Sequence, residues 1–133
     1  MGVPPIDGLI VLPTRHPPAE ILARTVAIAK SRGVTVFAQI DFSGDAARAK
    51  LSMKPTGMVI LGNPVAGTPL MVAAPTLAID LPLKILAFED AEGHAWVAYN
   101  DPQYLQRRHG FPEELLRNLA PIGALAEAVA RAD

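Results

Sequence analysis

The sequence predicts an α+β fold in which a mixed sheet of about five strands is packed with helices in a single-domain sandwich. Two patterns lead to this prediction. In the first half, short apolar runs typical of strands alternate with helical patterns, and in the second half two strand patterns flank a turn-rich linker before helical patterns return. Alternation of strand and helix favours parallel βαβ units, whereas a short linker favours an antiparallel pair. We therefore expect a βαβ-like first half and a C-terminal hairpin.

Length and composition are consistent with one domain over residues 1–133. A chain of this size buries roughly two-thirds of the surface that its unfolded form exposes. Half of the residues are hydrophobic but only 5% are aromatic, so the core must consist mainly of Ala, Val, Ile and Leu. The prolines are spread along the chain and fall where elements are expected to begin or end.

The first third of the chain predicts two strands with a helix between them. Residues 8–12 form a short apolar run, and residues 34–41 alternate along their length in the manner of a strand. Between them, Pro17 suits the first turn of a helix. A short Ala-rich helix is expected next, with Ser43 or Asp45 as its N-cap.

The middle of the chain predicts a buried strand and a further short helix. Residues 58–61 are continuously apolar, as expected of an interior strand that is covered on both faces. Thr68 is a good N-cap and Pro69 a good first helical residue, which predicts a helix over residues 70–74. If helical crossovers make the strands parallel, strands 34–41 and 58–61 end at the same edge of the sheet.

The last third predicts the hairpin and the closing helices. Residues 83–88 and 94–100 are strand patterns around a turn that contains Gly, so an antiparallel hairpin is expected. Asp101 then caps a short helix. A final helix is expected over residues 112–131, and Pro121 must kink or divide it because the proline ring opposes the carbonyl four residues earlier.

Composition argues against several classes of protein. Twelve Lys and Arg against thirteen Asp and Glu leave a formal charge of -1, so the basic footprint of a nucleic-acid-binding protein is missing. No apolar stretch approaches the roughly 20 residues that span a bilayer. Without cysteine the chain has no disulfide and no Cys-based metal site. We expect a soluble, cytoplasmic protein with no nucleic-acid partner and no membrane segment.

No cofactor is expected, because the metal and nucleotide signatures are incomplete. None of the three histidines has a second histidine at a metal-binding spacing, so no metal site is predicted. Gly62 and Gly67 are spaced like the glycines of a phosphate-binding P-loop, but Thr68 stands where that loop has its Lys. Nucleotide hydrolysis is excluded, since its cationic contributions are lacking. The pattern identifies no catalytic residue and leaves the existence of a reaction open.

Five polar residues near strand ends are candidates for binding a ligand: Asp41, Asn63, Thr68, Tyr99 and Asn100. In parallel sheets, ligands bind beyond the carboxyl ends of the strands, so a pocket is expected to contain Asn63 and Thr68 and to draw on Asp41. A small anionic ligand would sit on the helix start at Thr68, with Asn63 orienting it and Asp41 binding a hydroxyl or serving as a base. Tyr99 and Asn100 join this pocket only if the last hairpin strand points the same way.

Each candidate also has a purely structural explanation. Thr68 can cap its own helix, and Asn63 can brace its loop through its own amide. Tyr99 can be a half-buried residue of the sheet, while Asn100 satisfies the turn before the next helix.

Ordered motifs in the second half of the chain identify a family. They are Gly62-Asn63-Pro64, Gly67-Thr68-Pro69-Leu70, Asp80-Leu81-Pro82-Leu83-Lys84, Tyr99-Asn100-Asp101-Pro102 and Arg108-His109-Gly110. This order resembles the bacterial and archaeal domain-of-unknown-function 302 family. The resemblance implies a sheet with helices packed against it, a homodimer and no known activity. Many relatives have a histidine after the aspartate that ends the strand, whereas this chain has Phe42, so a site that uses that imidazole is not expected here.

Two classes of function are consistent with the sequence. The first is a domain that binds a small molecule or anion in a pocket at the strand ends. The alternative is a structural homodimer without a ligand, in which the polar motifs serve as turns and caps around a self-complementary surface. A pocket whose polar groups are not all bonded internally favours the first class, and a flat surface favours the second.

Overall fold

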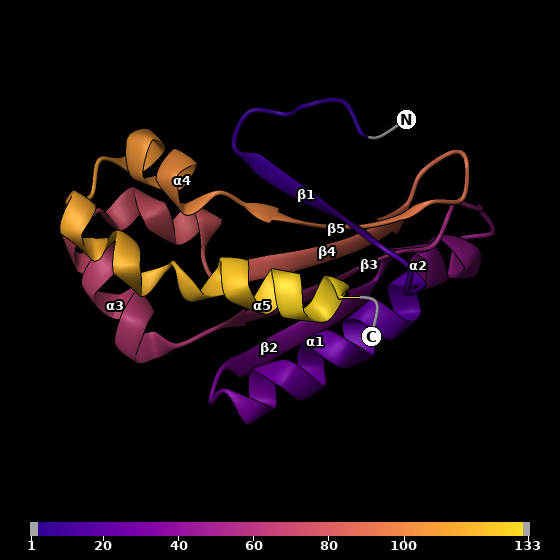
Figure 1. The fold of residues 1–133 in the computed structure, drawn as a ribbon, viewed down its shortest axis with the longest axis horizontal. Helices are drawn as coiled ribbons and strands as arrows, with labels where there is room; N and C mark the ends of the chain where they lie inside the picture. The colour runs from indigo at the N-terminus through magenta and orange to yellow at the C-terminus, as the bar shows by residue number, and fades with distance from the viewer. Residues whose placement is uncertain (1–2, 132–133) are drawn as a thin grey trace.

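Five strands form one sheet in the computed structural model, which describes residues 3–131 (Figure 1). The strands are β1 (Leu9–Thr14), β2 (Thr35–Asp41), β3 (Thr56–Gly62), β4 (Leu83–Glu89) and β5 (Ala95–Asn100). The α-helices are α1 (Pro18–Ser31), α2 (Phe42–Arg48), α3 (Pro64–Ala73), α4 (Pro102–His109) and α5 (Pro121–Ala130). Two short 3-10 helices, η1 (Pro75–Asp80) and η2 (Glu113–Asn118), follow α3 and precede α5.

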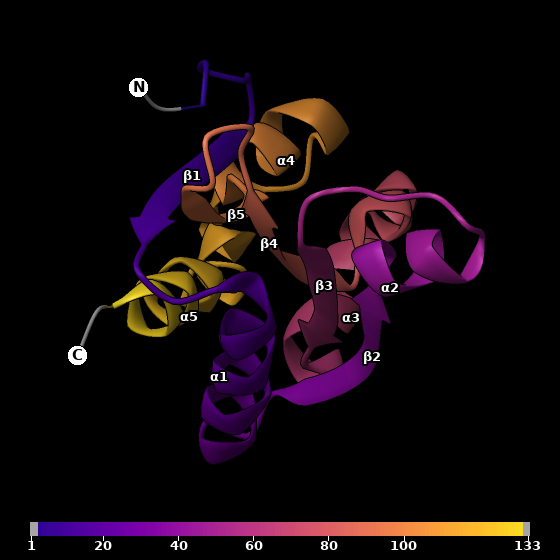
Figure 2. The same cartoon turned by 90° about the vertical axis from the view of Figure 1, so that its right-hand side faces the viewer.

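The strands lie in the order β1-β5-β4-β3-β2, and every neighbouring pair is antiparallel. The α+β class and the five strands are confirmed, but the expected parallel pairing is wrong, and so the sheet is not mixed. β1 and β2 do run in the same direction, as a βαβ unit requires, yet they form opposite edges of the sheet. β2 and β3 are antiparallel because α2 lies at the end of the sheet and turns the chain back (Figure 2).

The C-terminal hairpin is confirmed as the β4–β5 pair. Its turn is organised by the Asp90 carboxylate, which accepts hydrogen bonds from the backbone amides of Glu92 and His94 and from Trp96 Nε1. The Trp96 bond, followed by the backbone bonds, holds the pKa of Asp90 below its ordinary value of 3.8. Gly93 supplies the left-handed backbone of the turn with a φ of 84°.

Helices α1 and α5 cover one face of the sheet, and the main core lies between them and the strands (Figure 2). Along β3, buried side chains alternate with half-buried ones, because alternate residues of a strand point to opposite faces. β3 is an interior strand, as predicted, since it pairs with β2 and β4. The expectation that both of its faces are covered is wrong. The buried core residues of this layer include Ile21, Val59, Leu61, Ile85, Val97, Leu125 and Val129.

A second apolar cluster lies at one end of the sheet, among α3, η1, α4 and η2 (Figure 1). Its buried side chains include Leu70, Leu77, Leu105, Phe111 and Leu119. Beside this cluster, the Asp80 carboxylate accepts a hydrogen bond from Arg108 Nη1 at 2.9 Å and lies 2.6 Å from His109 Nε2. The other ring nitrogen of His109 lies 2.9 Å from Thr76 Oγ1. These contacts fasten η1 to the last turn of α4.

The helix starts agree with the sequence at α4 and differ at α2 and α3. Asp101 caps α4 as predicted, by accepting a hydrogen bond from the amide of Gln103 at 3.0 Å. The N-cap of α2 is Asp41, and the N-cap of α3 is Asn63. Thr68 therefore lies inside α3 and does not cap it. The helix predicted over residues 112–131 is divided into η2 and α5, and α5 begins at Pro121.

Candidate functional site

A cleft of about 430 Å³ opens beyond the end of β3, between the start of α3, the residues before β4 and the start of α5. Its volume is within the range of roughly 300–1,000 Å³ that is usual for small-molecule sites. Most of its lining is apolar: Val34, Phe37, Leu61, Met71, Leu81, Leu83, Leu119, Ile122, Ala124 and Leu125 contribute. We call this feature the α3–α5 cleft.

Four polar side chains also line the α3–α5 cleft: Arg32, Asn63, Thr68 and Asn118. Arg32 is the one charged residue in the lining, which contains no carboxylate. Because Arg32 is exposed, its guanidinium lies at the rim and not in the apolar interior. An arginine is protonated at all physiological pH values, so the lining carries one positive charge.

Asn63 organises the first turn of α3. Its Oδ1 accepts a hydrogen bond from the Val65 amide at 2.9 Å, and its backbone oxygen accepts from the Ala66 and Gly67 amides at 3.0 and 2.8 Å. Pro64, the first helical residue, has no N–H to offer. The first turn therefore has no free amide, and the anion site expected from helix amides is not formed. What Asn63 still offers a ligand is its side-chain NH2 group, which donates to no acceptor among residues 3–131.

Thr68 lines the same cleft from within α3, and its side chain is exposed. The structure thus brings Asn63 and Thr68 together as predicted, although Thr68 contributes a hydroxyl only. Asn118 donates from Nδ2 to the carbonyl of Ala66 at 3.0 Å and joins η2 to α3. The sequence reasoning missed Asn118 because it belongs to no local motif. The sequence analysis also missed Arg32, which lies at the end of α1 and joins the cleft only through the tertiary structure.

Asp41 lies at the opposite end of the sheet, and its predicted place beside Asn63 is wrong. It pairs with Gly57, whereas Asn63 follows Gly62, and this five-residue separation along β3 corresponds to about 17 Å. The cause is the antiparallel pairing of β2 and β3. The Asp41 carboxylate instead accepts hydrogen bonds from the Gly44 amide at 2.9 Å and from Ser43 Oγ at 3.0 Å. The Gly44 bond, then the Ser43 bond, lowers the pKa of Asp41 below 3.8.

Tyr99 and Asn100 are at the same end of the sheet as Asn63, because β3 and β5 run in the same direction. Neither residue lines the α3–α5 cleft. Tyr99 is 8% exposed and packs in the main core, and this burial, with the nearby negative charges of Glu127 and Asp101, raises the pKa of its phenol. Asn100 pairs with Leu9 of β1.

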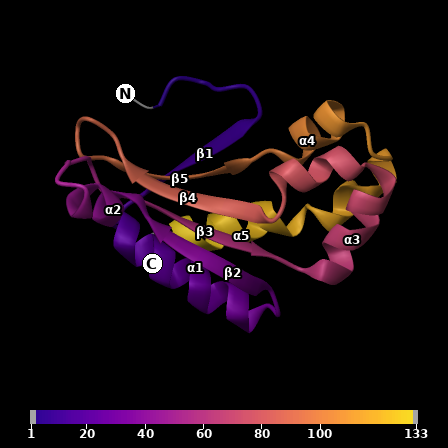
Figure 3. The same cartoon turned by 180° about the vertical axis from the view of Figure 1, so that it is seen from behind.

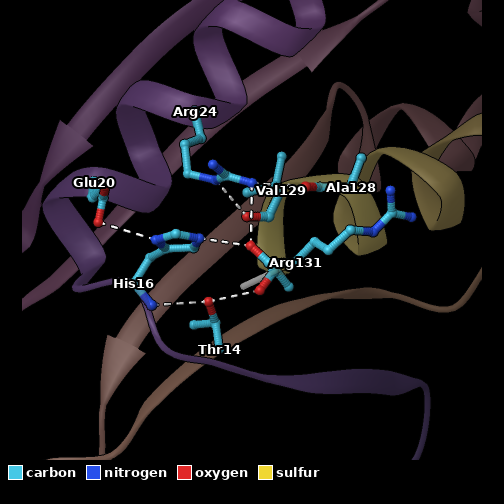
Figure 4. A network of polar contacts seen from close by, with 8 residues as sticks. Thr14, His16, Glu20, Arg24, Ala128, Val129 and Arg131 are labelled. Carbon is cyan, nitrogen blue, oxygen red and sulfur yellow. Dashed lines mark hydrogen bonds and ion pairs between the residues drawn. The ribbon is translucent and has the colours of Figure 1, made fainter. Parts of the chain in front are cut away.

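A polar network holds the C-terminal end of α5 at the other end of the sheet (Figure 4). Arg24 donates to the carbonyls of Val129, Ala128 and Arg131 at 2.9, 3.1 and 3.2 Å. His16 Nε2 lies 2.6 Å from the Arg131 carbonyl, and Thr14 Oγ1 donates to the carbonyl of Ala130 at 2.9 Å. We call this feature the carbonyl network; it supplies the partners that the last turn of a helix lacks.

No group of three or more His, Asp or Glu side chains is placed to hold a metal ion among residues 3–131. Within the same residues, no helix has both the length and the apolar character needed to cross a bilayer.

Sequence comparison matches the chain to a family model and to curated proteins of three Brucella species. The family described as Domain of unknown function DUF302 matches residues 10–129. Over 103 residues, the chain is 43% identical to a protein of Brucella suis named "Fluoride-specific ion channel FluC 1", covering 77% of this chain and 41% of that protein. A Brucella abortus protein of the same name is also 43% identical, with 38% of its length covered. The chain thus spans about two fifths of the curated relatives that it matches.

A solved structure supports the fold. The chain is similar to the crystal structure of an uncharacterized conserved protein DUF302 from Bacillus stearothermophilus, with a TM-score of 0.75. The match covers 94% of this chain and 97% of that one at 16% sequence identity. At this identity the likeness establishes the shared architecture and says nothing about a ligand.

Proposed function

The chain belongs to the Domain of unknown function DUF302 family, and we propose that it binds a small molecule with an apolar body and an acidic group in the α3–α5 cleft. The observation that carries this proposal is the composition of the lining. Apolar side chains form most of it, and its single charge is the arginine at the rim. The sequence-based expectation of a small anionic ligand is kept in this form, with its location changed from the helix amides to Arg32.

The apolar lining favours an organic ligand. Each CH2 group that leaves water for such a surface contributes about 0.8 kcal/mol, so a short alkyl or aromatic body gains affinity from the lining alone. A monatomic anion would gain nothing from it. The Brucella relatives are named for fluoride, which is a small and strongly hydrated ion, and the apolar walls of this cleft suit it poorly.

The polar groups favour an acidic head on that ligand. Arg32 forms no ion pair with a carboxylate among residues 3–131. Its guanidinium therefore keeps its donors for a carboxylate or sulfonate, which it can bind through two parallel hydrogen bonds. The free NH2 group of Asn63 adds a neutral donor to the same cleft. Thr68 and Asn118 complete a polar side to an otherwise apolar site.

Titration calorimetry with octanoate, octanol and sodium fluoride tests this proposal. Octanoate has both the apolar body and the acid, octanol lacks the charge, and fluoride lacks the body. We expect octanoate to bind most tightly and fluoride to give no heat of binding. Arg32→Gln should weaken octanoate about tenfold, the equivalent of one charge-assisted hydrogen bond, and leave octanol unchanged. Lys30→Gln is the matched control, because it removes a charge from the same helix end outside the cleft.

A second variant fills the site. Ala124 is exposed on α5 and lines the cleft, so Ala124→Phe should block octanoate without disturbing a buried position. Ala73→Phe places the same ring on an exposed position of α3 that does not line the cleft, and it should bind octanoate normally. Equal octanoate affinity in wild type and Ala124→Phe would show that the α3–α5 cleft is not the site.

A further inference from the structure

Thr76, Asp80 and His109 form a connected polar group between η1 and the last turn of α4, which we call the Thr76 cluster. Figure 3 shows η1, which precedes β4, lying beside α4. Thr76 Oγ1 lies 2.9 Å from His109 Nδ1, and His109 Nε2 lies 2.6 Å from Asp80 Oδ2. None of the three residues lines the α3–α5 cleft. A hydroxyl, an imidazole and a carboxylate in this order are the groups that activate a nucleophile, because the imidazole is the base and the carboxylate orients it.

The two partners of the His109 ring set the direction of a proton transfer. A carboxylate only accepts hydrogen bonds, so the neutral ring carries its proton on Nε2 and donates it to Asp80. Nδ1 then holds a lone pair, and the Thr76 hydroxyl donates to it. In this arrangement the imidazole can take the proton of the hydroxyl as that oxygen attacks a substrate.

The base is shielded and held in place, whereas the hydroxyl is accessible. The side chains of His109 and Asp80 are only 5% and 15% exposed. Arg108 Nη1 donates to both oxygens of Asp80, at 3.2 and 2.9 Å, and so fixes the carboxylate. Thr76 is exposed, so a substrate can reach it from solvent. The groups are therefore in position before a substrate arrives, which removes part of the entropic cost of the reaction.

We infer that the Thr76 cluster hydrolyses small carboxylic esters through an acyl-threonine. Thr76 Oγ1 attacks the ester carbonyl carbon while its proton passes to His109 Nδ1. As the bond from that carbon to the leaving oxygen breaks, the leaving oxygen takes the proton from Nδ1 and departs as an alcohol, and Thr76 carries the acyl group. Water then attacks the same carbon and gives a proton to Nδ1. The bond to Oγ1 breaks, Oγ1 regains the proton, and the carboxylic acid is released.

The surface position of the Thr76 cluster indicates which esters it accepts. Thr76 is open to solvent and lies outside the α3–α5 cleft, so the remote parts of a large substrate add little binding energy. The reaction therefore depends on the reactivity of the ester itself. A small ester with a good leaving group is the suitable substrate, and 4-nitrophenyl acetate is the probe.

Mass spectrometry of the protein quenched in acid during turnover of 4-nitrophenyl acetate tests the inference. We expect an acetyl group on Thr76, which hydroxylamine removes because it is an ester. Thr76→Ser should keep the acetyl group, since serine supplies the same hydroxyl. Thr76→Val should lose it, and the protein-dependent release of 4-nitrophenol should fall at least about tenfold, because a positioned base contributes roughly 100- to 10,000-fold to a rate.

His94→Gln is the matched control for His109→Gln. His94 is an exposed imidazole whose Nδ1 lies 3.6 Å from Asp90 Oδ2, and its ring has no hydroxyl partner among residues 3–131. The control should still acetylate Thr76, whereas His109→Gln should not. An acetyl group found on lysine or histidine alone would overturn the inference, and so would an unchanged release of 4-nitrophenol by Thr76→Val. Circular dichroism establishes that the variants are folded, and the acetylation site of the wild type decides if one is not.

Discussion

The two ends of α5 have different surroundings at the two ends of the sheet. The start of α5 lines the α3–α5 cleft, where the walls are apolar and one arginine stands at the rim. The last carbonyls of α5 are held at the other end by Arg24, His16 and Thr14 (Figure 4). Hydrogen bonds hold the C-terminal end of α5, whereas the start of α5 packs among apolar side chains beside the cleft. A ligand site needs polar groups that are not bonded within the protein, and the cleft end offers the Asn63 NH2 group and the Arg32 guanidinium.

The cleft end and the network end also differ in their charged residues. Residues 55–79, which contain β3 and α3, include no charged residue at all. The carbonyl network contains Glu20 as well, whose carboxylate lies 3.1 Å from His16 Nδ1. The cleft end is therefore expected to depend on packing, and the network end on ionic hydrogen bonds.

The largest expected effect is at the cleft end. Phe111 is fully buried in the apolar cluster of α3, η1, α4 and η2, and Phe111→Ala should destabilise the protein by about 3–5 kcal/mol through lost burial and a cavity. Urea denaturation measures the loss, which should not depend on salt. A loss below about 1 kcal/mol would mean that packing does not hold this end.

The carbonyl network should give a smaller effect. Arg24→Ala removes three hydrogen bonds to the last carbonyls of α5 and should cost about 2 kcal/mol, as for hydrogen bonds to a charged group. Arg24→Lys cannot reach three carbonyls at once and should recover only part of the loss. Lys30→Ala, an exposed change on the same helix, should stay within about 0.5 kcal/mol of wild type. Equal stabilities for Arg24→Ala and Lys30→Ala would show that the carbonyl network does not stabilise the protein.

The smallest expected effect is the pH dependence of local stability around Asp41 and Asp90. Asp41 and Asp90 both lie at the network end of the sheet, and the hydrogen bonds that they accept lower their pKa values in the folded state. The stability that these bonds contribute is present above 3.8 and is lost as the pH falls through the lower folded values. The amide protection factors should therefore fall first around α2 and the β4–β5 turn on acidification. An earlier fall of the protection factors in β3 and α3 would contradict this division.

The parts of the fold that follow from local chemistry were predictable. Asp101 before a proline defines the start of α4, and a Gly-containing turn between two strand patterns defines the hairpin. Pro121 divides the C-terminal helical region because a proline lacks the N–H that the helix needs. In each case the residues that decide the structure lie within a few positions of one another.

The wrong predictions depended on long-range pairing or on two equivalent local signals. Residues 34–41 and 58–61 have strand patterns that suit a parallel or an antiparallel pair, so Asp41 could not be placed from sequence. Asn63-Pro64 and Thr68-Pro69 are both cap-and-proline pairs, and the first begins the helix. α3 tolerates Pro69 because Pro69 and Val65, whose carbonyl loses its partner, are exposed to solvent. Arg32 approaches the cleft only through the packing of α1, which no local pattern reports.

The central claim is that the apolar cleft beside Arg32, and no other part of the sheet, receives a ligand with an acidic group. An amide NMR titration with octanoate tests it most directly, because the shifts report the place as well as the binding. The account predicts saturable shifts at Gly62, Gly67 and Asn118, which line the cleft, with none at Asp41 or in the carbonyl network. Shifts confined to the Asp41 end or to the carbonyl network, or an octanoate affinity that Arg32→Gln leaves unchanged, would contradict the account.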